Sequence, residues 1–275
     1  MDNESSTLTT FQTPFGRYRT TRLPFGLSVS SEIFQKRLCQ ALEGLSGASA
    51  VADDILVYGV GDTIEEATID HEVKLKALLE RCMKVGIKLN KDKSRFGLKE
   101  IQFLGHTITD QGLKADTSKV DALLKMQKPE DKKGVARLQA TVNYLARFLP
   151  KLSETMAPIR ALLKEDVAWN WNATHDKAFE QVKQLLTKAP VLAYYDPKVE
   201  LSIECDASNS GLGAALLQKG QPIAYTSRTL TDAETRYAPI EKEMLAVVFS
   251  LEKWHHFTYG RHVTVYSDHK PLQSI

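Results

Sequence analysis

Two adjacent carboxylates, Asp53 and Asp54, interrupt the apolar stretch VADDILVYG, which spans residues 51–59. Apolar runs of this length are typical of buried strands, and two neighbouring negative charges are costly to bury unless a partner compensates them. Mg²⁺ could be such a partner because it prefers hard oxygen ligands, and two such ions can stabilise the attacking and leaving oxygens of a phosphodiester reaction. A surface turn between two hairpin strands explains the same residues without chemistry, so both interpretations stay open at this point.

A second set of carboxylates depends on a predicted β-β-β-α-β order near the end of the chain. ELSIECDAS, GLGAALLQ and QPIAYTSRTL alternate or run apolar as strands do, a helix is predicted over about 233–258, and HVTVYSD reads as a last strand. A strand that follows a helical crossover usually pairs in parallel with an earlier strand. We therefore expect Asp206 and Asp268 at the same sheet edge, with Glu243 projecting from the helix. Any α/β domain has carboxylates at strand ends, so spacing alone leaves a structural explanation open.

Apolar periodicity predicts further elements on either side of Pro129. Before it, we expect a helix within 28–45, a hairpin around the aspartates, a helix over about 63–85 closed by Gly86, and short strands at 87–90 and 103–109. After it, helical patterns continue to about residue 188, including an amphipathic helix over 174–188.

Composition is that of a soluble globular protein. The chain has 275 residues, of which 43% are hydrophobic and 25% charged, with neither a membrane-length apolar run nor a secretory leader. Its three cysteines, Cys39, Cys82 and Cys205, lie too far apart for a metal motif and are expected to be reduced thiols of an intracellular protein. The net charge of +2 does not by itself predict nucleic-acid binding.

Charge is concentrated between residues 74 and 99. Nine Lys or Arg residues there face only Glu80 and Asp92, which gives a local net charge of 9 − 2 = +7. The segment could bind phosphate or could simply be a solvated helix face followed by a loop.

Several independent motifs resemble the reverse transcriptase of gypsy-type long-terminal-repeat retrotransposons. They are FQTPFGRYRTTRLPFGLSVSSEIFQKRL, VADDILVYG, GIKLNKDKSRF and IQFLGHTIT. VNYLARFLPKLS, APIRALL and APVLAYYDP resemble the thumb and connection of that family, and ECDASNSGLGAALLQ, AYTSRTLTDAETRYAPIEKEMLAVV and SDHKPL resemble its ribonuclease H domain. The resemblance covers nearly the whole chain in the family's order.

The resemblance implies a multidomain α+β and α/β protein. Residues 1–110 would form reverse transcriptase fingers and palm without the first catalytic strand, 111–196 a helical thumb and connection, and 197–275 a truncated ribonuclease H-like domain. The family's third polymerase aspartate and fourth ribonuclease H carboxylate have no counterpart here. We therefore expect a fragment of a Pol polyprotein, accompanied by a protease and an integrase elsewhere, with impaired activity and little DNA synthesis by this chain alone.

The resemblance also assigns roles to individual residues. Asp53 and Asp54 match the polymerase metal-binding pair, and Asp206, Glu243 and Asp268 match three metal ligands of the ribonuclease H site, with Mg²⁺ as cofactor and Mn²⁺ as a possible substitute. The remaining positions are the nucleotide-pocket residues Leu23, Pro24, Phe25 and Gly26, the triphosphate neighbour Lys93, and the primer-gripping residues Phe103, Leu104, Gly105 and His106. Val51 replaces the family's usual tyrosine, and Thr141 stands where glycine is frequent.

The implied function is RNA-directed DNA polymerase activity coupled to ribonuclease H. Its partners would be an RNA–DNA hybrid, a template–primer duplex and deoxynucleotide triphosphates, and no membrane is involved. A catalytically inactive remnant, or a co-opted nucleic-acid-binding protein, is the alternative. The hairpin and primer-grip motifs argue against a ribonuclease-H-like integrase or transposase.

Overall fold

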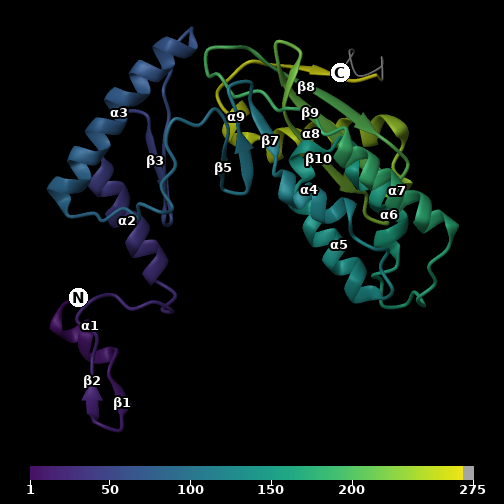
Figure 1. The fold of residues 1–275 in the computed structure, drawn as a ribbon. Coiled ribbons are helices and arrows are strands. Elements are labelled where there is room, and N and C mark those ends of the chain that lie inside the picture. Colours follow the sequence, from purple (N-terminus) through teal and green to yellow (C-terminus); the bar gives the residue numbers. More distant parts are fainter. Residues whose placement is uncertain (269–275) are drawn as a thin grey trace. The chain divides into compact units, whose positions relative to one another are not determined.

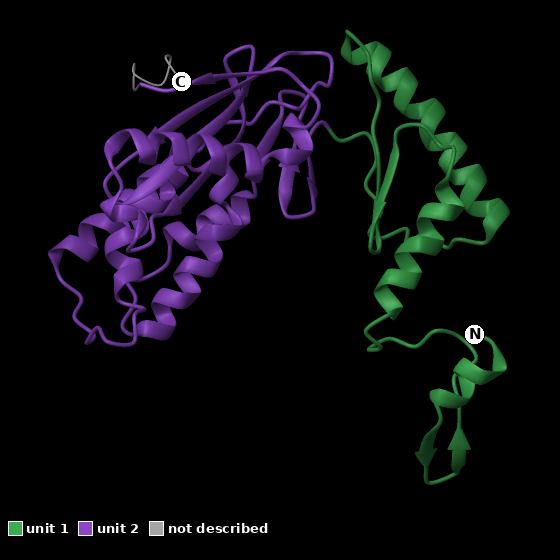
Figure 2. Cartoon of the chain, turned by 180° about the vertical axis from the view of Figure 1, so that it is seen from behind, with its two compact units in different colours: residues 1–98 green, residues 99–275 purple. Residues whose placement is uncertain are grey.

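The computed structural model describes residues 1–268 and divides the chain into two compact units, residues 1–98 and 99–275 (Figure 2). The predicted domain boundaries at 110 and 196 stay predictions, and the end of the SDHKPL motif, from His269 on, lies outside the described residues. Within the described part, no helix has the length and apolar character to cross a membrane. All three cysteines are free thiols, with Cys82 and Cys205 buried and Cys39 exposed.

The first unit combines short strands with two long helices. Its elements are α1 (Asn3–Leu8), β1 (Phe11–Thr13), β2 (Gly16–Tyr18), α2 (Ser30–Leu42), β3 (Ala48–Val51), β4 (Asp54–Val57) and α3 (Ile64–Val85). The predicted bounds of α3 are confirmed because both caps are present: the Thr63 side chain accepts from the Glu66 amide, and Gly86 adopts the left-handed conformation.

A small core joins α2 and α3 to the β3–β4 hairpin. It consists of Leu38, Leu42, Leu78 and Cys82, with Ile55 and Ile87 packed at its margin. The strand predicted at 87–90 is wrong, because those residues form no strand. The Ile87 amide bonds instead to the Cys82 carbonyl, so the segment closes the end of α3 rather than entering a ladder.

The second unit begins with a small antiparallel sheet and a group of helices (Figure 1). The strands are β5 (Ile101–Phe103), β6 (His106–Ile108) and β7 (Leu113–Ala115); the helices are α4 (Thr117–Leu124), α5 (Lys132–Tyr144), the 3₁₀ turn η1 (Ala146–Phe148), α6 (Leu152–Ala161) and α7 (Ala173–Thr187). One buried cluster, which includes Leu138, Phe148, Ile159 and Phe179, holds the helices together.

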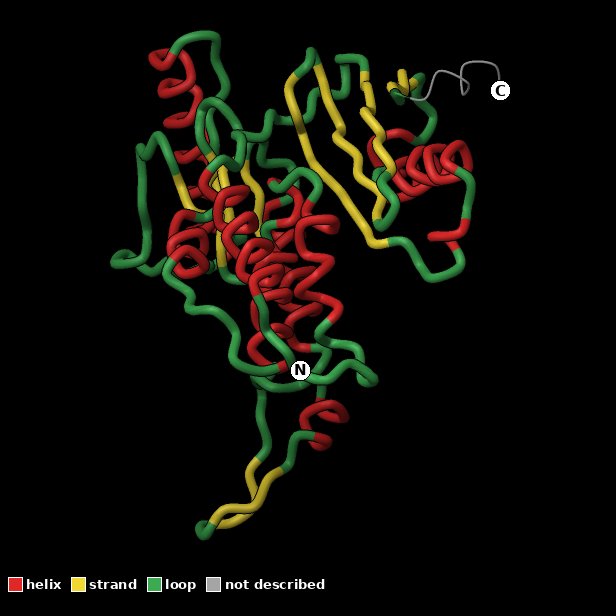
Figure 3. The backbone as a smooth tube through the Cα atoms, turned by 90° about the vertical axis from the view of Figure 1, so that its right-hand side faces the viewer, coloured by secondary structure: helices red, strands yellow, loops and turns green. Residues whose placement is uncertain are grey.

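A four-stranded sheet follows in the order β10-β9-β8-β11 (Figure 3). Its elements are β8 (Leu201–Ala207), β9 (Gly211–Gln218), β10 (Gln221–Thr229), η2 (Glu234–Arg236), α8 (Pro239–Lys253), α9 (His255–Thr258) and β11 (Val263–Tyr266). The predicted β-β-β-α-β order is confirmed, and β11 pairs with β8 in parallel as expected. A second buried cluster, with Ile203 from β8, Leu216 from β9 and Ala246 from α8, joins the helix to this sheet.

The single helix predicted over 233–258 is instead divided into η2, α8 and α9. Tyr237 and Ala238 are extended, and Pro239 occupies the first turn of α8. Proline favours that position because its missing N–H would have no helical partner there, whereas in a helix interior it would break the ladder.

Replacing Gly112 with alanine is expected to lower the melting temperature of the chain markedly. Gly112 has a φ of +142°, and a Cβ atom there would lie 2.2 Å from the Leu192 carbonyl oxygen, which accepts from the Leu113 amide. Strain and clash together should cost roughly 2–4 kcal/mol. Gly220→Ala is the matched control: its φ is also positive, at +74°, but the space around it is open, so the cost should stay near about 1 kcal/mol. Equal melting temperatures for the two variants would contradict this account.

Candidate functional site

Asp53 and Asp54 lie where the β3–β4 hairpin turns. Val51 pairs with Asp54, so Ala52 and Asp53 form the turn, as predicted. Of the two interpretations left open by the sequence, the surface turn is the one observed, because residues 51–54 are all exposed. The two charges are therefore solvated, and the hairpin can carry them without an internal partner.

Helix α2 holds this hairpin from its outer edge. The Gln35 side chain donates to the Ala50 carbonyl at 2.7 Å and accepts from the Ala52 amide at 2.6 Å. At the other end of the helix, the Ser30 hydroxyl donates to the Pro24 carbonyl at 2.7 Å. One helix thus positions both the aspartate turn and the loop that contains residues 23–26.

The other predicted residues of unit 1 are accessible. Leu23 and Pro24 are half-buried, whereas Phe25, Gly26 and Lys93 are exposed. Lys93 lies in a turn beyond α3, and its backbone amide bonds to the Asn90 carbonyl. Their roles at a nucleotide stay predictions.

Part of the basic segment 74–99 serves the fold of unit 1. Lys74 pairs with Asp70 at 2.5 Å, and the Arg81 guanidinium donates to the carbonyls of Ala41 and Glu43. Those two side chains are engaged internally, and a phosphate-binding role for the rest of the segment stays a prediction.

The predicted primer-gripping residues form a tight hairpin tip in unit 2. Phe103 pairs with His106, and Leu104 and Gly105 make the turn. The Tyr144 hydroxyl at the end of α5 donates to the Leu104 carbonyl at 3.0 Å. The His106 ring lies 5.6 Å from that of Tyr144 and 5.4 Å from that of Phe148. Burial, followed by the charges of Arg147 and Lys119, lowers the pKa of His106.

The three carboxylates of the four-stranded sheet approach one another at a single edge. Asp206 lies near the end of β8, Glu243 lies on the first half of α8, and Asp268 follows β11. Tyr266 pairs with Glu204, so two further residues bring Asp268 level with Asp206. The parallel pairing thus places Asp206 and Asp268 at the same sheet edge, as the crossover rule predicts, and their role as metal ligands stays a prediction.

Glu243 is the buried member of this group. Its carboxylate accepts from the Ala207 amide at 3.3 Å and from the Ser267 hydroxyl at 3.4 Å. Burial raises the pKa of Glu243 most, and the charges of Asp268 and Asp206 raise it further. The three negative charges therefore oppose one another, and a cation would relieve that repulsion.

Asp206 already has a cation beside it. The Lys151 ammonium lies 2.5 Å from the Asp206 carboxylate, and both side chains remain largely exposed. Lys151 precedes α6 in a left-handed conformation, with a φ of 51°. Its role could not be predicted from the sequence, because the contact joins segments 55 positions apart that only tertiary packing brings together.

The oxygen donors at this edge are of the type that Mg²⁺ takes. Even so, within residues 1–268 no group of three or more His, Cys, Asp or Glu side chains is arranged closely enough to hold an ion. The donor chemistry fits a divalent ion, and the Lys151 ammonium already lies beside one of the three carboxylates, Asp206.

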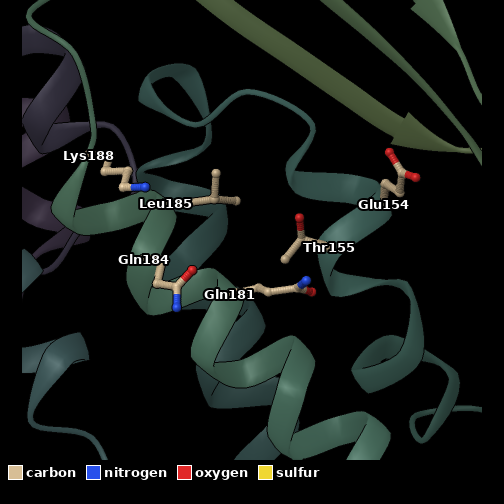
Figure 4. Close-up of a pocket in the computed structure, with 6 residues that line it drawn as sticks. All are labelled: Glu154, Thr155, Gln181, Gln184, Leu185 and Lys188. Carbon is tan, nitrogen blue, oxygen red and sulfur yellow. The ribbon is translucent and has the colours of Figure 1, made fainter.

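A cavity of about 340 Å³ between α6 and α7 is separate from the predicted site residues (Figure 4). Its lining side chains are Glu154, Thr155, Gln181, Gln184, Leu185 and Lys188. All of these residues except Leu185 have polar side chains, and none of them is a predicted nucleotide, primer or metal position.

Known proteins match both parts of the chain. Residues 1–108 match the reverse transcriptase (RNA-dependent DNA polymerase) family, and residues 171–265 match the RNase H-like domain found in reverse transcriptase. The chain is 33% identical over 279 residues to the retrovirus-related Pol polyprotein from transposon 412 of Drosophila melanogaster, an alignment that covers 99% of this chain and 22% of that protein. It is 30% identical over 254 residues to the transposon Tf2-3 polyprotein of Schizosaccharomyces pombe, covering 90% and 19% respectively. The chain thus spans about a fifth of these relatives.

Solved structures agree with this match. The foamy viral protease-reverse transcriptase in complex with dsDNA superposes with a TM-score of 0.86 at 25% identity, covering 100% of this chain and 58% of that one. The same viral protein in complex with an RNA/DNA hybrid gives a TM-score of 0.83, with 100% and 38% coverage. The predicted fold class is confirmed.

Fold and matches together define a reverse transcriptase joined to a ribonuclease H-like domain. Both families generally use divalent metal ions. The chain belongs to the reverse transcriptase and ribonuclease H region of retrotransposon Pol polyproteins.

The free energy of unfolding is expected to fall as the pH decreases through about 6.5, partly because of His106. Its lowered pKa means that the unfolded chain binds the proton more readily than the folded one, so acid favours unfolding until the folded-state pKa is passed. Chemical denaturation at a series of pH values should show a smaller slope for His106→Gln than for the unmodified chain. Substitution of the exposed His255 should leave the slope unchanged. An unchanged slope in His106→Gln would disprove the assignment.

Proposed function

We propose that the chain carries two sites for Mg²⁺-dependent phosphodiester chemistry. One is an RNA-directed DNA synthesis site at Asp53 and Asp54, and the other cleaves RNA in an RNA–DNA hybrid at Asp206, Glu243 and Asp268. The observation that carries the proposal is the placement of these last three carboxylates at one sheet edge, where burial, followed by the charges of Asp268 and Asp206, raises the pKa of Glu243. The family match to both enzymes supports it.

At the sheet edge, Asp206, Glu243 and Asp268 would hold Mg²⁺ or Mn²⁺. The bound ion supplies an activated water and stabilises the charge that develops on the scissile phosphate. Glu243 is buried and bonded to the Ala207 amide, so it provides a fixed oxygen. Asp206 and Asp268 are more accessible and can meet both the ion and the nucleic acid.

At the hairpin, the exposed aspartates would face the primer end and the incoming nucleotide. Leu23, Pro24, Phe25 and Gly26 would line the nucleotide pocket, Lys93 would approach the triphosphate, and residues 103–106 would hold the primer. A template–primer duplex, deoxynucleotide triphosphates, and the protease and integrase of a Pol polyprotein are the corresponding partners. An intracellular location fits this set.

Cleavage of an RNA–DNA hybrid should require Asp206. In Asp206→Asn the cluster loses one negative ligand, and the cleavage rate with Mg²⁺ should fall by roughly a hundredfold or more, as for removal of a group that acts in the transition state. Gel analysis of a labelled hybrid measures the rate. Glu204→Gln is the matched control, because it removes the same charge from the same strand, two residues away, and should cleave like the unmodified chain.

Two results would overturn the cleavage assignment. One is an Asp206→Asn variant that cleaves as fast as the unmodified chain. The other is a Glu204→Gln variant that loses as much activity as Asp206→Asn while both keep the same melting temperature.

A second candidate function is nucleic-acid binding without catalysis, and the Lys151–Asp206 ion pair favours it. If the ammonium blocks the ion site, Lys151→Gln should raise the affinity for Mn²⁺, measured by calorimetry, and should increase hybrid cleavage. Lys219→Gln, on an exposed turn between β9 and β10, is the control and should change neither. If both Lys151→Gln and the unmodified chain bind the hybrid but do not cleave it, the non-catalytic function is the correct one.

A further inference from the structure

Two cations gather around the aromatic side chains behind the β5–β6 hairpin tip. The Lys119 ammonium of α4 lies 4.0 Å from the centre of the Tyr144 ring. The Arg147 guanidinium of η1 lies 6.0 Å from the centre of the Phe148 ring. The His106 ring packs against both aromatic rings, so all these side chains share one small region.

Neither cation has an acidic partner. Among the described residues, Lys119 and Arg147 take part in no ion pair. Asp116 is the nearby acid, but its carboxylate is engaged as the cap of α4, where it accepts from the Ser118 amide at 2.9 Å and the Ser118 hydroxyl at 2.7 Å. Burial lowers the pKa of Arg147, which shows that this guanidinium is partly withdrawn from water. A partly desolvated cation without a carboxylate is suited to an external anion.

The tip itself is fixed beside these cations. Tyr144 bonds to the Leu104 carbonyl, and its hydroxyl oxygen would lie 1.6 Å from a Cβ atom at position 105. Only glycine allows this approach, and both turn residues have positive φ, 50° for Leu104 and 72° for Gly105. The hydroxyl therefore ties the hairpin tip to the end of α5.

We propose that Lys119 and Arg147 form a binding site for a phosphate of the nucleic-acid backbone, and that Tyr144 is the positioning residue that holds the hairpin tip against it. The proposal rests on the proposed function, since it takes the hairpin of residues 103–106 as a nucleic-acid contact. It adds the two cations and the tyrosine, none of which the hairpin motif contains. Cations stabilised over aromatic rings keep their place without a carboxylate and remain able to meet a phosphate.

The test measures binding of a fluorescein-labelled RNA–DNA hybrid to the full chain by anisotropy at several salt concentrations. Each lost phosphate contact should reduce the slope of log K against log salt by somewhat less than about 1. Lys119→Gln and Arg147→Gln should each show that reduction, with affinity lowered roughly threefold to tenfold at low salt. Lys125→Gln, at the exposed end of the same helix α4, should keep the slope.

Tyr144→Phe separates positioning from charge. It removes only the hydroxyl, so affinity should fall while the slope stays the same. Tyr194→Phe is its matched control, because the Tyr194 hydroxyl bonds to the Thr109 and Gly112 carbonyls at the other end of the same small sheet. That variant should bind like the unmodified chain, and thermal melts should confirm that all variants fold.

The outcomes distinguish this inference from the proposed function. If the unmodified chain does not bind the hybrid at all, the proposed function fails and the inference falls with it. If the unmodified chain binds and Lys119→Gln keeps both affinity and slope, the phosphate site is wrong while the proposed function stands. If Tyr144→Phe binds like Tyr194→Phe, the positioning role is wrong.

Discussion

Parallel pairing of β11 with β8 is the constraint on which the nuclease half of the structure depends. The pairing requires a crossover, α8 supplies it, and the same geometry that satisfies the strands places Asp206 and Asp268 at one edge with Glu243 between them. The resulting repulsion is a cost that folding must offset. The Ala207 amide and the Ser267 hydroxyl bond to Glu243, and the Lys151 ammonium neutralises Asp206. One of the three carboxylates is thus already paired with a cation of the chain itself.

The two aspartates of unit 1 lie at a strained turn, which Ala52 and Asp53 form between β3 and β4. Three two-residue hairpin turns begin with a non-glycine residue at positive φ. In two of them, Leu104–Gly105 and Lys219–Gly220, glycine follows and relieves the turn. In the third, Ala52 alone has a positive φ, 50°, and Asp53 follows it, so the strained residue of this turn is Ala52. Gln35 compensates by bonding to the outer edge of β3 on both sides of Val51. The strained turn is therefore stabilised by Gln35, a residue of helix α2, rather than by the residues of the turn itself.

The features that the sequence predicted were those that depend on local pattern. Alternation and the crossover rule predicted the β-β-β-α-β order and the shared edge of Asp206 and Asp268. Apolar periodicity, with Gly86 as the closing residue, predicted α3. The errors arose where tertiary context decides. Residues 87–90 have strand composition but no partner strand, and the exposure of Asp53 and Asp54 depends on how far the hairpin extends past its core. The contacts of Lys151, Gln35 and Tyr144 could not be predicted from any sequence motif. They became visible only in the folded structure.

Charge placement connects the two halves. Solvated carboxylates such as Asp53 and Asp54 cost little to fold, whereas the Arg147 guanidinium is partly withdrawn from water and burial lowers its pKa. Arg228 is a cation that does have an acidic partner. It lies 2.7 Å from Glu234 and depresses the pKa of that carboxyl to about 2. The net charge of +2 therefore says little about these surfaces, because individual charges differ in whether an opposite charge lies beside them.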